Sequence, residues 1–92
     1  MQITYDQTKN IRNIKERGLS FDRAVGFDFG TAKFWLDTRM DYPETRIVAI
    51  GYLDAPLHVL VFSETISGIR VISFRKANQR EGEKHGFALT SN

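Results

Sequence analysis

The sequence contains no cysteine among its 92 residues. This absence excludes a disulfide framework and a thiolate metal site, and it is consistent with a reducing cytoplasm, where we expect the protein to act. No apolar run approaches the length of a membrane span. Residues 1–5 also lack the basic and then apolar pattern of a signal peptide. We therefore expect no membrane partner.

Several signatures of catalysis are also missing. The acidic residues are scattered and there are only two histidines. The clustered ligands of a metal nuclease are therefore absent, and we expect neither a metal nor a cofactor. Residues 26–30 have the wrong glycine spacing for a phosphate-binding loop. Neither a nucleophile elbow nor a paired catalytic motif occurs.

The chain does contain enough apolar material for one small domain. Its hydrophobic content is 41%, and it has seven Phe, three Tyr and one Trp, which supply bulk for one core. We expect this domain over residues 1–86 and a flexible tail over residues 87–92. A chain this short is marginally stable alone, so a dimer or a partner would help it.

The residue pattern predicts an α+β fold. We expect a strand at 2–5, then a helix from the Asp6 N-cap to about 17 with Ile11 and Ile14 as its apolar stripe. A shorter helix follows, capped by Ser20, with Phe21, Ala24 and Val25 on one face. The remaining elements are strands at 32–37, 45–53, 57–65 and from 69, and a helix ending near 86. Short turns join the later strands, which predicts an antiparallel meander. We therefore expect a small antiparallel sheet of four to five strands, with two N-terminal helices and one C-terminal helix packed on it.

Positive charge is concentrated at one predicted strand-to-helix junction, residues 69–84. The whole chain carries a net charge of +2, whereas this stretch has only two acids against five cations, which are Arg70, Arg75, Lys76, Arg80 and Lys84. Cations placed in this way suit a polyanion, and RNA or DNA is the usual one. A solvated charged face is the simpler interpretation of the same pattern.

Motifs spread over the chain resemble the BrnT family of type II toxins. They are Asp6-x-x-Lys9-x-x-x-Asn13-x-Lys15-x-x-Gly18, Phe21-x-x-Ala24, Asp37-x-Arg39-x-x-x-x-Glu44-x-Arg46-x-x-x-Ile50-Gly51 and Arg70-x-Ile72-Ser73-x-Arg75-Lys76-Ala77-x-x-x-Glu81. Their order and spacing cover almost the whole chain. Two positions depart from the family pattern: Arg17 stands where the family usually has His, and His85 where it usually has an aromatic residue.

The resemblance implies a function and partners. Members of this family are endoribonucleases that inhibit growth and share a RelE-like fold, and an antitoxin encoded beside each one covers its active surface. The implied partners are an RNA substrate and a cognate BrnA-like antitoxin, with promoter DNA bound only through the antitoxin complex. A dimer or a heterotetramer with the antitoxin is the implied assembly.

RNA can be cleaved without a metal, because the ribose 2′-OH can attack the neighbouring phosphorus. Guanidinium groups suit the stabilisation of the extra negative charge, since they bind phosphate oxygens in a fork and stay protonated. We expect Arg46, Arg70, Arg75 and Lys76 to converge on one phosphate, and Lys76 and Arg80 to share one face of a helix. The candidate catalytic residues are Arg46, Arg70, Arg75, Lys76 and Glu81.

The proton acceptor and the RNA contacts are less defined by the sequence. Glu81 or Glu44 can take the proton if they lie near the cations, and Lys15 or Lys76 can do so if crowding by other cations lowers the lysine pKa. The candidate RNA-binding residues are Lys15, Ser73, Arg80 and Lys84. Two alternative functions use the same cations: a nucleic-acid-binding module without catalysis, and a domain that docks on an acidic protein.

Overall fold

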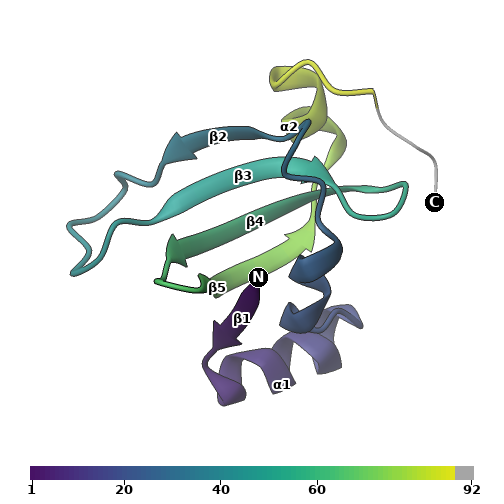
Figure 1. Cartoon of the computed structure of the whole chain (residues 1–92). Helices are drawn as coiled ribbons and strands as arrows, with labels where there is room; N and C mark the ends of the chain where they lie inside the picture. Colours follow the sequence, from purple (N-terminus) through teal and green to yellow (C-terminus); the bar gives the residue numbers. More distant parts are fainter. Residues whose placement is uncertain (89–92) are drawn as a thin grey trace.

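The computed structural model describes residues 1–88 and shows one twisted sheet with helices around it (Figure 1). In chain order the elements are β1 (Gln2–Tyr5), α1 (Gln7–Arg17), the 3₁₀ helix η1 (Phe21–Gly26), β2 (Lys33–Leu36), β3 (Ile47–Tyr52), β4 (Leu57–Glu64), β5 (Gly68–Lys76) and α2 (Gln79–Lys84). The predicted α+β class is confirmed, and each predicted strand is present. In the described part of the chain, no helix is both long and apolar enough to cross a membrane.

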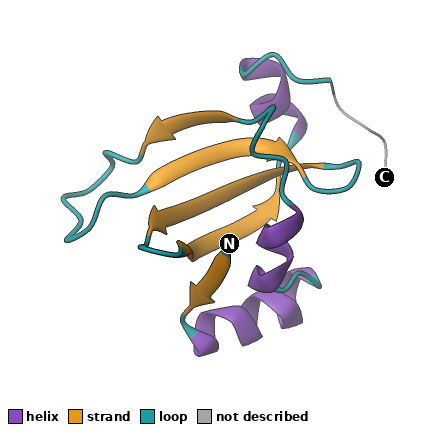
Figure 2. Ribbon diagram, in the orientation of Figure 1, coloured by secondary structure: helices purple, strands orange, loops and turns teal. Residues whose placement is uncertain are grey.

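The five strands lie in the order β1-β5-β4-β3-β2 (Figure 2). The strands β2 to β5 form the predicted antiparallel meander. The first strand departs from the prediction, because β1 pairs with β5 in parallel. The connection explains the difference: α1 and η1, and not a hairpin turn, join β1 to the rest of the sheet, so its direction is not fixed by a turn.

The second of the two predicted N-terminal helices is a 3₁₀ helix, so the structure has one N-terminal α-helix and not two. Ser20 caps it as expected, with its side chain accepting from the Asp22 N–H. Phe21 and Ala24 are 2% and 0% exposed, whereas Val25 is 65% exposed. A 3₁₀ helix has three residues per turn, so residues three apart align on the buried side and their neighbour does not.

Hydrogen bonds attach α1 to the rest of the fold. The predicted apolar stripe is wrong, because Ile11 and Ile14 are 63% and 45% exposed, whereas Asn10 is buried. The Asn10 Oδ1 accepts from the first backbone N–H of η1 at 2.7 Å. The Asn13 amide donates to the Phe74 carbonyl of β5 at 3.0 Å. Two asparagine side chains, and not a buried apolar stripe, therefore attach α1 to the rest of the fold.

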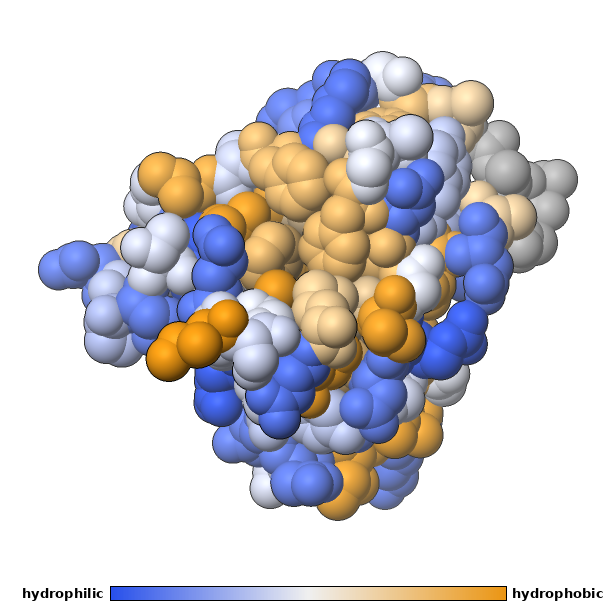
Figure 3. All heavy atoms as spheres, in the orientation of Figure 1, coloured by the Kyte–Doolittle hydropathy of each residue, from blue (hydrophilic) through white to orange (hydrophobic). Residues whose placement is uncertain are grey.

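Buried side chains form one cluster on each face of the sheet. The cluster beneath η1 is rich in aromatic rings and includes Phe21, Phe27, Phe62 and Phe74. Figure 3 views this side, where apolar atoms gather across the middle and hydrophilic atoms surround them. The cluster on the opposite face is aliphatic and comprises Val48, Ile50, Leu57, Val59 and Val61. We call the face with the aromatic cluster the closed face and the face with the aliphatic cluster the open face.

The chain stays attached to the fold just beyond α2. Phe87 donates its N–H to the Gly82 carbonyl at 2.9 Å, and its ring lies 5.6 Å from that of Tyr52. The Tyr52 hydroxyl donates to the Ala88 carbonyl at 2.7 Å. The first two residues of the expected tail are therefore hydrogen-bonded to the fold, and residues 89–92 lie outside the described part of the chain.

Candidate active site

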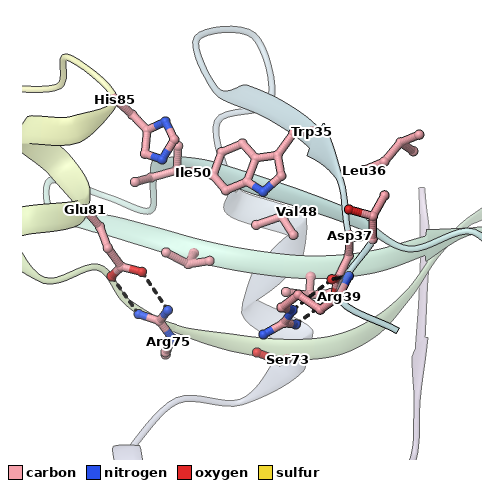
Figure 4. Close-up of a pocket in the computed structure, with 13 residues that line it drawn as sticks. Trp35, Leu36, Asp37, Arg39, Val48, Ile50, Ser73, Arg75, Glu81 and His85 are labelled. Atoms are coloured by element: carbon pink, nitrogen blue, oxygen red, sulfur yellow. Dashed lines mark hydrogen bonds and ion pairs between the residues drawn. The ribbon is translucent and has the colours of Figure 1, made fainter. Parts of the chain in front are cut away.

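The open face carries a hollow of about 330 Å³ between β2, β5 and α2 (Figure 4). Its floor is formed by aliphatic side chains of β3 and β4, namely Val48, Ile50, Val59 and Val61. Its rim is polar or aromatic and includes Trp35, Asp37, Arg39, Ser73, Arg75, Glu81 and His85. We call this cavity the open-face hollow.

A bulge in β5 determines which of its side chains reach this hollow. Val71 and Ser73 pair with consecutive residues of β4, so Ile72 is the extra residue. Beyond the bulge, Ser73 and Arg75 pair with residues of the aliphatic floor and share its face. Side chains alternate along a strand, so Lys76 lies on the opposite face from its neighbour Arg75.

Arg75 is held in a two-point ion pair with Glu81 of α2. Its two terminal nitrogens lie 2.8 Å from the two carboxylate oxygens. Glu81 also accepts from the Asn78 N–H at 2.9 Å and closes a capping box. The hydrogen bonds from Arg75 lower the pKa of Glu81 to about 2, and the bonds to Glu81 raise the pKa of Arg75. Glu81 is thus ionised and engaged with Arg75.

Arg39 forms a similar pair with Asp37 on the other side of the hollow. The distances are 2.8 Å from Nε to Oδ1 and 2.7 Å from Nη2 to Oδ2. The Asp37 side chain is 1% exposed and that of Arg39 is 74% exposed. Hydrogen bonds from Arg39 lower the pKa of Asp37 to about 2. Arg39 and Arg75 both line the hollow, and Figure 4 shows their guanidinium groups facing this common space.

An aromatic pair closes the third side of the hollow. The rings of Trp35 and His85 stack with centroids 4.5 Å apart and an interplanar angle of 11°. Lys33 donates to the His85 carbonyl, which ties the end of α2 to β2. The candidate residues chosen from the sequence omitted Trp35, Arg39 and His85. The motif Asp37-x-Arg39 was a sequence signal for Arg39. Strand alternation gave no signal for His85.

Most of the predicted cationic cluster is not assembled. Arg46 pairs with Glu44 at 3.2 Å and lies over the Tyr42 ring, in a separate depression formed by the loop before β3. Arg70 is exposed and lies on β5 before the bulge. The predicted convergence of four cations is therefore wrong, and only Arg75 of that set lines the open-face hollow.

Lys76 ends β5 and belongs to the closed face. The helix begins at Gln79 after the Asn78 N-cap, so the predicted helical face shared by Lys76 and Arg80 is also wrong. Lys76 lines a second hollow of about 330 Å³ together with Arg17, Arg23 and His58. Burial lowers the pKa of His58. The second hollow therefore contains cations around a histidine that favours its neutral form.

The remaining predicted residues are exposed. Lys15, Arg80 and Lys84 lie on the outer sides of α1 and α2, outside the open-face hollow. Ser73 is the one predicted RNA contact that lines it. Within residues 1–88, no three His, Asp or Glu side chains gather closely enough to hold a metal ion.

Comparison with known proteins identifies a family. The sequence model of a family described as the ribonuclease toxin BrnT of type II toxin–antitoxin systems matches residues 5–81 of the chain. No curated protein matches the chain. The matched span runs from the end of β1 to Glu81, so it includes most of the rim of the open-face hollow but not His85.

Proposed function

The chain belongs to the BrnT family of ribonuclease toxins, and we propose that it cleaves RNA in the open-face hollow without a metal ion. A type II toxin has an antitoxin as its partner. In our proposal the toxin acts in the cytoplasm, where loss of RNA inhibits translation and growth. A DNA-binding antitoxin silences it by covering the hollow, and promoter DNA is bound only through that complex.

The observation that carries this proposal is the pair of guanidinium groups that flank one cavity. Each carboxylate partner occupies one edge of its arginine. A guanidinium has five N–H donors, so Arg39 and Arg75 both keep donors for a phosphate. The carboxylates hold the guanidinium groups in place before substrate arrives, and such preorganisation is what electrostatic catalysis requires.

The proposed reaction is an internal transesterification. The ribose 2′-oxygen loses its proton and bonds to the adjacent phosphorus, and the bond from phosphorus to the 5′-oxygen breaks. The products are a 2′,3′-cyclic phosphate and a 5′-hydroxyl, which takes up one proton. Arg39 and Arg75 stabilise the charge on the non-bridging oxygens, and Ser73 donates a hydrogen bond to one of them.

His85 is our candidate for proton transfer. Imidazole accepts and donates protons near neutral pH, and this ring lines the hollow. Glu81 and Glu44, the two carboxylates considered from sequence as acceptors, are each bonded to an arginine. Glu81 is better suited to position Arg75. Trp35, which is 39% exposed, offers a ring on which a base of the RNA can stack.

The test is RNA cleavage by the purified protein in EDTA, with analysis of the product ends. We expect shortened RNA that carries 2′,3′-cyclic phosphate and 5′-hydroxyl ends. RNA binding without shortened products would support the non-catalytic module instead, and products with 5′-phosphate ends would overturn the proposed chemistry.

A second experiment tests the proposed regulation in cells. We expect growth arrest when the protein is expressed alone, and restored growth when the adjacent gene is co-expressed. Healthy growth of cells that overproduce the folded protein alone would contradict its action as a toxin.

A further inference from the structure

We infer that the substrate RNA leaves the open-face hollow around the edge of β5 beyond Val71 and that its phosphates bind Lys9, Arg12 and Arg17 of α1. This inference rests on the proposed function, since it concerns the path of the same RNA. It assigns the binding of the flanking RNA to a helix on which the sequence pointed only to Lys15.

The proposed path begins at the point where β5 no longer pairs with β1. β1 pairs with β5 only as far as Val71. Beyond that residue α1 approaches the edge of β5, and Asn13 donates to the Phe74 carbonyl. A depression of about 240 Å³ lies between α1 and β5, and Ser73 lines both this depression and the open-face hollow. The two cavities therefore meet at Ser73.

The α1 side of this depression is basic. It is lined by Lys9, Arg12 and Glu16, which are three and four residues apart and share one side of the helix, and by Arg17 at the helix end. Arg17 also lines the second hollow on the closed face, next to Arg23. The open-face hollow, the depression and the second hollow are thus successive parts of one polar path. We call the middle part the α1 groove, and it is lined by Lys9, Arg12, Asn13, Glu16, Arg17, Phe21 and residues 72–74.

The cations of the α1 groove differ from those of the hollow. Lys9, Arg12 and Arg17 are exposed, and none of them forms an ion pair with another residue in the 1–88 range. A phosphate that binds there displaces only water and counterions, which is the basis of sequence-independent affinity for nucleic acid. The groove therefore supplies affinity and the hollow supplies chemistry.

The decisive variant is Lys9→Gln/Arg12→Gln. Its matched control is Gln7→Glu/Ile66→Glu, which also lowers the net charge by two. Gln7 is exposed on α1 but does not line the groove, and Ile66 is fully exposed in the turn between β4 and β5. Far-ultraviolet circular dichroism and thermal melting establish that both variants are folded.

Two RNAs are compared after the cleaved bond has been mapped with the unsubstituted protein. The short RNA spans only that bond and its immediate neighbours, and the long RNA extends beyond it on both sides. The advantage of the long RNA is the ratio of its kcat/KM to that of the short RNA. In the groove variant this ratio should fall roughly tenfold, as expected for two lost exposed charge contacts. The control should keep the original advantage.

Binding of the long RNA, with a 2′-deoxy sugar at the cleaved position, gives an independent measurement. Each phosphate contact on a single strand contributes about 0.7 to the slope of log K against log salt. The groove variant should therefore lose about 1.4 of that slope, and the control should keep it. Equal slopes and equal advantages in the variant and the unsubstituted protein would overturn the inference.

The outcomes separate this inference from the proposed function. If the unsubstituted protein cleaves neither RNA, the proposed function fails while the salt slope still tests the groove. If the groove variant handles both RNAs normally but no longer binds the antitoxin, the groove is a protein interface and the inference is wrong.

Discussion

The two faces of the sheet are completed in different ways. On the closed face, Phe21 and Phe74 are 2% and 1% exposed, and η1 seals the aromatic cluster. On the open face, aliphatic side chains form the floor of a hollow whose rim holds the arginine–carboxylate pairs. Burial of apolar area drives folding, whereas ion pairs at partly exposed positions contribute little stability. The larger cluster of buried side chains lies on the closed face, which therefore holds the fold together, and we propose that the open face carries the chemistry.

The most severe test of this comparison is Phe74→Ala on the closed face. Phe74 is among the largest fully buried side chains, so its truncation should cost about 3–5 kcal/mol of unfolding free energy. Urea unfolding measures this loss. The matched control is Val25→Ala at an exposed position of η1, which should change stability by less than about 0.5 kcal/mol. Similar small losses for both variants would contradict the role given to the closed face.

His85→Gln tests the open face. Loss of a general acid or base should slow RNA cleavage by about 100-fold and remove one limb of the pH–rate profile. The unfolding free energy should change by less than about 1 kcal/mol, because the ring packs at a rim and not in a core. A matched control is Glu83→Gln on α2. If cleavage slows only in proportion to the fraction of unfolded protein, His85 has a structural role alone.

Asn13→Ala tests how α1 is attached. The substitution leaves the Phe74 carbonyl without its side-chain donor and should cost about 1–2 kcal/mol. Hydrogen exchange of the α1 amides should accelerate, while the amides of β4 keep their protection. Lys15→Ala on the exposed side of the same helix is the control. Uniform acceleration across the sheet would show that α1 is not a separately attached element.

The two faces should also respond to acid in different pH ranges. His58, on the closed face, has a pKa lowered by burial, so the unfolded chain binds its proton first and stability falls as the pH drops below about 6.5. Glu81, on the open face, has a pKa of about 2 against 4.5 ordinarily. The stability that ionised Glu81 contributes to the fold is present above pH 4.5 and is lost as the pH falls toward 2. Glu81→Gln should flatten only the lower range of a pH–stability curve.

Much of the fold could be predicted from local pattern. β1 has the predicted bounds, and the alternation of β3 and the apolar run of β4 place both strands within about two residues. The spacing of Phe21, Ala24 and Val25 fits an α-helix, and the 3₁₀ helix that forms buries only Phe21 and Ala24 of the three. Nothing local indicates that asparagines, and not isoleucines, face the core from α1.

The candidate site was harder to predict because it depends on contacts distant in sequence. The extra residue Ile72 in β5 changes which side chains share a face, and a bulge leaves no periodic signal. Arg39 reaches the hollow from a loop, and His85 reaches it only because α2 folds back onto Trp35 of β2. The sequence therefore identified Arg75, Glu81 and Ser73 of the hollow but not Trp35, Arg39 or His85.

The most direct test of the account is Arg75→Lys, measured for RNA cleavage and for stability on the same sample. Lysine keeps the positive charge but loses the planar fork that binds both Glu81 and phosphate. We predict that cleavage slows by about 100-fold or more, while the unfolding free energy changes by less than about 1 kcal/mol. Cleavage at the original rate would contradict the placement of the chemistry in the open-face hollow.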